Sequence, residues 1–152
     1  MPVSTKAGRL RKGRVSEVGR IYLLTTVVYQ RRAVFADWRL GRLVVEQLKL
    51  VQEDGWADVL TWVVMPDHFH CLLELREKTL AQVMCRIKSR SSLAVNQALG
   101  RTGRLWQKGY HDRAVRKDED VKTLARYVIQ NPIRAGLVER VHDYPLWDAC
   151  WL

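Results

Sequence analysis

Two strand-like runs joined by a short proline link constrain the fold of this chain more than any other feature. Residues 58–65 are mostly apolar on both faces, which is typical of a central strand. Residues 68–75 alternate in polarity instead. The link Met65-Pro66-Asp67 indicates a tight turn, because proline cannot continue a central strand. The two runs therefore predict an antiparallel hairpin.

Alternate side chains of a strand point to the same face, so the second run divides into two sets. Phe69, Cys71, Leu73 and Leu75 form a wholly apolar face, which predicts contact with a core. His68 and His70 share the opposite face, where two neighbouring imidazoles can chelate one metal ion. The simpler interpretation is a pair of partly exposed histidines near a turn. The run alone leaves both interpretations open.

Helix and strand patterns recur on both sides of this hairpin. A β-branched and aromatic run predicts a strand over 21–29, and moderate β character predicts another over 110–115. Asp37 and Thr79 are candidate caps of two helices, which we expect over 40–51 and from Leu80 through Leu93 to Val95. A last helix follows the acidic residues 118–120 and runs to about Gln130, stopping before Pro132.

The order β-α-β-β-α-β-α predicts an α+β fold: a ferredoxin-like, split βαβ antiparallel sheet with helices on one face, plus the C-terminal helix. Such a sheet leaves its other face open for a site. The length of 152 residues suits one domain with a real core. We therefore expect a basic N-terminal arm over 1–18, followed by a single domain over 19–152 that includes the C-terminal tail.

The charge of the chain favours a polyanionic partner, most often nucleic acid, although an unrelated basic enzyme is the alternative. Lys and Arg number 26 against 16 Asp and Glu, for a formal net charge of +10. The arm contributes Arg9, Arg11, Lys12 and Arg14. The three cysteines lack Cys-x-x-Cys spacing, which favours a reduced cytoplasmic setting. No apolar segment is long enough to span a membrane.

The last helix carries a second candidate half of the site. Tyr127 lies at the edge of its apolar stripe, and Asn131 follows one turn later. Packing of the tyrosine ring at a core margin would also explain this position. A tyrosine hydroxyl can cut a phosphodiester if negative charge on the phosphate is neutralised, and a metal held by two histidines and an amide oxygen would do so. The histidine pair together with Tyr127 and Asn131 favours cleavage of a nucleic-acid strand.

Two stretches of the sequence resemble a known family. Residues 65–70, Met-Pro-Asp-His-Phe-His, resemble the His-hydrophobe-His signature of the IS200-like, single-tyrosine HUH transposases. Residues 105–112 and 126–138, the second of which contains Tyr127-Val-Ile-Gln-Asn-Pro-Ile-Arg-Ala-Gly-Leu-Val138, are similar to the REP-associated tyrosine transposases. The resemblance covers about residues 18–148.

The resemblance implies a mechanism and a partner. Tyr127 would attack single-stranded DNA next to a hairpin of a repetitive extragenic palindrome (REP), leaving a 5′-phosphotyrosine that allows rejoining without ATP. His68, His70 and Asn131 would bind a divalent ion, Mg²⁺ or Mn²⁺, with Gln130 as a substitute for Asn131. The protein would be cytoplasmic and associated with bacterial DNA, as a monomer or homodimer. Candidate DNA contacts are Arg9, Arg11, Lys12, Arg14, Lys88, Arg90, Arg126 and Arg134.

Two other functions remain open on the sequence. A non-catalytic binder of hairpin or single-stranded nucleic acid would need aromatic platforms on the central strands, where this chain has histidines. A metal-dependent hydrolase would need a general base, for which Glu74 is the strand carboxylate on the histidine face. Trp106 could stack on a base or lie in the core, and His111 could line the site or sit at a strand edge.

Overall fold

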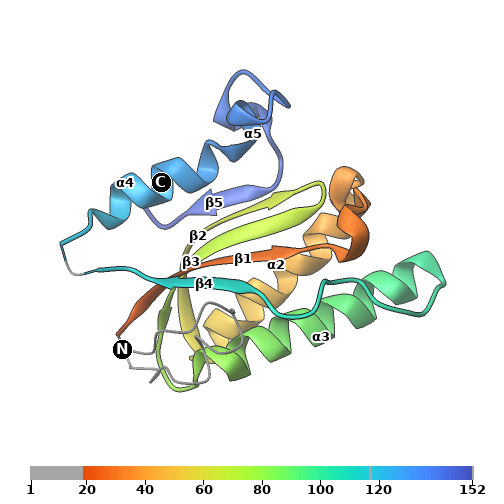
Figure 1. Cartoon of the computed structure of the whole chain (residues 1–152), viewed down its shortest axis with the longest axis horizontal. Helices are drawn as coiled ribbons and strands as arrows, with labels where there is room; N and C mark the ends of the chain where they lie inside the picture. Colours follow the sequence, from red (N-terminus) through yellow and green to blue (C-terminus); the bar gives the residue numbers. More distant parts are fainter. Residues whose placement is uncertain (1–18, 117, 152) are drawn as a thin grey trace.

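A five-stranded sheet is the centre of the computed structural model, which describes residues 19–116 and 118–151 (Figure 1). The strand order is β4-β1-β3-β2-β5. The strands are β1 (Ile21–Val27), β2 (Ala57–Met65), β3 (His68–Leu75), β4 (His111–Ala114) and β5 (Trp147–Ala149).

All neighbouring strands are antiparallel, so β1 and β2 run parallel to each other with β3 between them. The predicted α+β class and antiparallel sheet are confirmed, and the order of the first four strands is the one that a split βαβ unit requires. β2 and β3 form the predicted hairpin, with Met65 opposite His68. The strand β5 was not predicted. Its three residues carry no strand periodicity of their own and pair with the outer side of β2.

Two long helices, α2 (Trp38–Glu53) and α3 (Leu80–Leu99), cover one face of the sheet (Figure 1). Both predicted caps are present. The Asp37 side chain accepts a hydrogen bond from the backbone N–H of Arg39. Thr79 and Gln82 form a reciprocal capping box. Short 3₁₀ turns, η1 (Tyr29–Arg31), η2 (Val34–Ala36) and η3 (Val141–Asp143), lie outside the helices.

The main core lies between this helix pair and the sheet. The apolar face of β3 is fully buried in it, as predicted, and Phe69 contacts Trp106 edge to face at a centroid distance of 5.5 Å. Trp106 is buried and its indole N–H donates to the Ser91 hydroxyl at 3.0 Å, so it belongs to the core and is not a free stacking surface.

Leu93 lies on α3 as expected but does not face the core. Its side chain is 62% exposed, because the stripe passes through Ser91 and Val95 instead.

The helix α4 (Val121–Ile129) and the short helix α5 (Asn131–Arg134) lie on the opposite face of the sheet (Figure 1). Asp120 caps α4 by accepting from the backbone of Lys122 and Thr123. Part of the apolar stripe of α4 meets the sheet in two small clusters, where Val128 joins Val63 and Met65, and Ala125 joins Leu72 and Val115. The face expected to be open is thus partly covered, since the apolar residues on this side of the sheet require burial.

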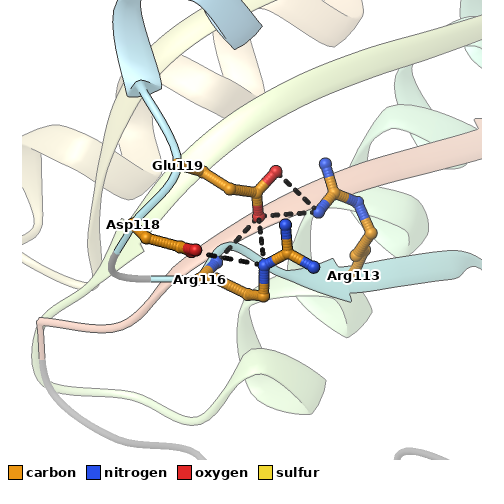
Figure 2. Close-up of polar contacts among 4 residues, drawn as sticks. All are labelled: Arg113, Arg116, Asp118 and Glu119. Carbon is orange, nitrogen blue, oxygen red and sulfur yellow. Dashed lines mark hydrogen bonds and ion pairs between the residues drawn. The ribbon is translucent and has the colours of Figure 1, made fainter.

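The segment between β4 and α4 is fixed by an ionic cluster (Figure 2). Both oxygens of Glu119 accept from Nη1 of Arg113, at 2.8 and 3.1 Å. Glu119 also accepts from the backbone N–H of Arg116, whose guanidinium contacts Asp118. The cluster joins the edge strand to the approach of α4. Among the described helices, none is long and apolar enough to cross a membrane.

Candidate active site

The two histidines lie on the face of the sheet that α4 covers. His70 stands between Thr25 of β1 and Val63 of β2, and His68 stands between Val27 and Met65. The two rings meet edge to face with centroids 4.8 Å apart. Neither residue is fully buried. The strand register therefore brings both imidazoles to one partly accessible point at the hairpin end of the sheet.

His68 is oriented by its neighbour in the turn. Its Nδ1 lies 2.6 Å from Oδ1 of Asp67, and Oδ2 of Asp67 accepts from Nη1 of Arg31 at 3.1 Å. Burial acts to raise the pKa of Asp67, but the contacts with His68 and Arg31 outweigh it and hold that pKa below its usual value. An ionised Asp67 can only accept, so Nδ1 of His68 donates to it and Nε2 is the ring nitrogen outside this hydrogen bond.

His70 is held in the same way by a different group. Its Nδ1 lies 2.8 Å from the Thr25 hydroxyl on the neighbouring strand. Burial, followed by the nearby charges of His68 and Arg134, lowers the pKa of His70 to about 4. His70 is therefore neutral near pH 7, which is the state that coordinates metals. Both rings use Nδ1 within the protein and leave Nε2 for a ligand.

His68 and His70 are of the residue type that most often binds metal ions. Within residues 19–116 and 118–151, no group of three His, Cys, Asp or Glu side chains could hold a metal, so a third protein ligand must be of another type. Asn131, the first residue of α5, donates its amide nitrogen to the carbonyl of Val128 at 2.7 Å. That bond leaves the amide oxygen, the atom a hard cation prefers, unused. The side chain of Gln130 is exposed, and no hydrogen bond fixes it among the described residues.

Tyr127 projects from α4 and is 59% exposed. A tyrosine serving only to fill a core margin would be more deeply buried than Tyr127 is. The guanidinium carbon of Arg134 lies 3.8 Å from the centre of its ring. Arg134 also contributes to the depressed pKa of His70. One cation thus contacts the tyrosine ring and acts electrostatically on His70.

The predicted DNA contacts and His111 differ in their surroundings and in their exposure. The ammonium of Lys88 donates to the carbonyls of Gln107 and Gly109, at 3.0 and 2.6 Å, and so also fixes the loop before β4. Arg90 and Arg126 are exposed. The arm residues Arg9, Arg11, Lys12 and Arg14 lie outside the described residues. His111 is exposed on the edge strand β4, opposite Thr25.

Glu74 does not reach the histidines. It lies four residues beyond His70 on β3, a separation of about 13 Å along a strand. Its carboxylate pairs with Arg76 at 3.2 Å. The nearer carboxylate is that of Asp67, which is already bonded to His68. A hydrolase with Glu74 as its general base is therefore not supported by this geometry.

Sequence reasoning missed three groups around the histidines. Asp67 could have been found, because an acidic residue directly before a candidate ligand is a common second partner of the imidazole. Thr25 and Arg31 could not have been found, because both reach the site only through the pairing of β1 with β3 and the turn that follows β1.

Comparison with known proteins assigns the family. The family model described as "Transposase IS200 like" matches residues 18–131. A REP-associated tyrosine transposase of Escherichia coli strain K12 is 28% identical over 97 residues, which cover 62% of this chain and 56% of that protein. A Haemophilus influenzae protein named for the same group is 27% identical over 93 residues, covering 54% of this chain and 53% of that protein. These matches span little more than half of either relative.

A solved structure has the same fold. The structure of a REP-associated tyrosine transposase bound to a REP hairpin superposes with a TM-score of 0.72 at 23% identity, covering 88% of this chain and 79% of that one. The resemblance that the motifs predicted is confirmed.

Proposed function

Because this chain belongs to the IS200-like transposase family, we propose that it cleaves and rejoins single-stranded DNA beside hairpins of repetitive extragenic palindromes. The similar structure that carries a REP hairpin supports the choice of DNA. The net charge of +10 supports a polyanionic partner of any sequence.

The observation that carries the proposal is the position of Tyr127. It stands exposed on α4, the helix that crosses the face of the sheet where His68 and His70 lie. Attack by its phenol oxygen on a DNA phosphate would form a 5′-phosphotyrosine and release a free 3′-OH. The reverse reaction with another 3′-OH would rejoin the strand without ATP, because the covalent link conserves the energy of the broken bond.

A divalent ion, Mg²⁺ or Mn²⁺, would be held by Nε2 of His68 and His70 and by the amide oxygen of Asn131. When bound, it would neutralise charge on the phosphate oxygens. Asp67 and Thr25 would hold the two rings in orientation through their Nδ1 atoms, and binding would require the Thr25 hydroxyl to accept from Nδ1 of His70. Gln130 is the alternative third ligand.

Basic residues outside this centre would bind the DNA backbone. Arg90 and Arg126 are exposed on the described surface, while Lys88 already donates to two carbonyls and would have to share its ammonium with a phosphate. The arm over 1–18 would add four further cations, Arg9, Arg11, Lys12 and Arg14. The protein would act in the bacterial cytoplasm on nucleoid DNA, as a monomer or a homodimer.

A covalent-trapping experiment tests the proposal. The protein is incubated with labelled single-stranded DNA that contains a hairpin, with Mn²⁺, and the products are separated under denaturing conditions. We expect a labelled protein adduct with the wild type and with Tyr29→Phe, which removes a tyrosine hydroxyl from η1 and leaves α4 unchanged. Tyr127→Phe should form none.

The other two functions predict different results. Cleavage that persists in Tyr127→Phe would indicate a hydrolase. Binding of the hairpin without cleavage in Mg²⁺ or Mn²⁺ would indicate a non-catalytic binder.

A further inference from the structure

Arg134 is the last residue of α5, and its side chain returns to Tyr127, seven residues earlier. Its guanidinium carbon is 3.8 Å from the centre of the tyrosine ring. This is the separation of a planar cation stacked on an aromatic face, and it fixes the ring more firmly than a single exposed helix position would. A lysine cannot reproduce the contact, because its ammonium is not planar.

The charge of Arg134 is not neutralised by a carboxylate among the described residues. Other described arginines are paired with a carboxylate, as Arg113 is with Glu119 and Arg140 is with Asp143. A stacked guanidinium still presents its N–H donors at its edge, where an anion can accept two of them at once. The structure thus keeps an uncompensated, oriented cation beside an exposed phenol.

The same cation acts electrostatically on His70. It is one of three causes that lower the pKa of His70, after burial and the charge of His68. Arg134 therefore contacts the ring of the proposed nucleophile and acts electrostatically on one of the proposed metal ligands.

We propose that Arg134 holds the ring of Tyr127 in position and binds a non-bridging oxygen of the target phosphate during attack. This role rests on the proposed function and goes beyond a backbone contact that only adds affinity. The phenol oxygen bonds to phosphorus, the bond from phosphorus to the 3′ oxygen breaks, the phenol proton passes to solvent and the 3′ oxygen takes one up. Negative charge grows on the phosphate oxygens in the transition state, where a fixed cation acts most strongly.

The test separates chemistry from binding. Arg134→Gln and Arg134→Lys are compared with Arg140→Gln, which removes the same charge from an arginine paired with Asp143. Three quantities are measured: the single-turnover rate of adduct formation at saturating hairpin DNA, the Kd of that DNA, and the Kd of Mn²⁺ for the DNA-free protein. Thermal unfolding checks that each variant folds.

Arg134→Gln should lower the single-turnover rate by about 100-fold or more, the usual loss for one transition-state donor, while changing the DNA Kd by less than about threefold. It should also tighten Mn²⁺ binding, because a like charge is removed from the neighbourhood of His70. Arg134→Lys should give an intermediate rate. Arg140→Gln should leave all three quantities unchanged.

Two results would overturn the role of Arg134 alone. One is a wild-type rate in Arg134→Gln. The other is a fall in DNA affinity that matches the fall in rate, which would make Arg134 an ordinary backbone contact. Failure of the wild type to form any adduct would instead overturn the proposed function, and this role with it.

Discussion

The two faces of β3 carry neighbouring residues in different surroundings. Phe69, Cys71, Leu73 and Leu75 enter a continuous core beneath α2 and α3 and are 0–1% exposed. His68 and His70, one residue away from them, lie beneath α4 and remain partly accessible. The first face is fixed by packing, and the side chains of the second are fixed by hydrogen bonds with Asp67 and Thr25.

The difference teaches how one strand can serve both stability and chemistry. A continuous core fixes the backbone of β3, so the histidines on its other side need only short contacts to be held in place. The α4 face has two small apolar clusters instead of one large core, and this leaves room for polar groups. Substitutions on the two faces should therefore change different measured quantities.

The largest expected effect on stability is on the core face. Phe69→Ala should reduce the free energy of unfolding by about 3–5 kcal/mol, because it removes a fully buried ring and its contact with Trp106. Urea denaturation measures this loss. His70→Asn, on the other face, should cost clearly less in the absence of metal. Equal losses would show that the two faces are not divided in this way.

Metal should stabilise the protein only through the α4 face. At Mn²⁺ concentrations about 100 times its Kd, the wild type should gain about 2.7 kcal/mol in unfolding free energy. His70→Asn should gain little, and Phe69→Leu should keep the gain despite its weaker core. Denaturation curves with and without Mn²⁺ provide the measurement. A gain retained in His70→Asn would place the ion elsewhere.

Two adjacent threonines give the sharpest matched pair. The Thr25 hydroxyl bonds to His70, whereas the buried Thr26 hydroxyl on the core face has no hydrogen-bond partner among the described residues. Thr25→Val should cost about 1 kcal/mol and weaken Mn²⁺ binding. Thr26→Val has the same shape change and should stabilise the fold by about 1 kcal/mol, because it removes an unsatisfied buried group. Calorimetric titration measures the Mn²⁺ affinity of both variants, and denaturation measures their stability. Equal changes in Mn²⁺ affinity would contradict the role given to Thr25.

The smallest expected effect on stability comes from changing the ionic cluster shown in Figure 2. Contacts with Arg113 and with the Arg116 backbone lower the pKa of Glu119. The ionised Glu119 therefore stabilises the fold fully above the usual carboxyl pKa near 4.5. This stabilisation is lost as the pH falls through the lowered pKa. Glu119→Gln should slightly lower the melting temperature near pH 7, more at low salt than at high salt. At a pH below the lowered pKa, the variant and the wild type should converge. Glu139→Gln, an exposed acid after α5, is the control, and a difference that persists in acid would contradict the ionic explanation.

Local signals in the sequence were enough for most of the fold. The caps Asp37 and Thr79, the hairpin and the first four strands all depend on residues close together in the chain, and all are confirmed. The strand β5 could not be predicted, because only the free edge of β2 makes its three residues a strand. Leu93 was misplaced because a buried Ser91, bonded to Trp106, occupies the core side of α3.

The residues proposed for the site could be named from the sequence, whereas the contacts around them could not. The histidine spacing and the position of Tyr127 on the edge of a stripe are local patterns, and the structure puts them on one side of the sheet. The break in the helix after Ile129 was expected from Pro132, but the chain continues as α5. In α5, Arg134 contacts the ring of Tyr127. A helix predicted to end before Pro132 gave no reason to expect this contact.

The chain that carries Tyr127 is anchored at both ends to opposite edges of one sheet. It leaves β4, which pairs with β1, crosses the face as α4 and α5, and returns as β5 on β2. The tail before β5 is further fixed by the Tyr144 hydroxyl on the carbonyl of Val64 and by Leu146 against Gly41. Exchange of this helix with a second copy of the chain would require one edge strand to be detached from the sheet, so the pairing of both edge strands opposes such an exchange.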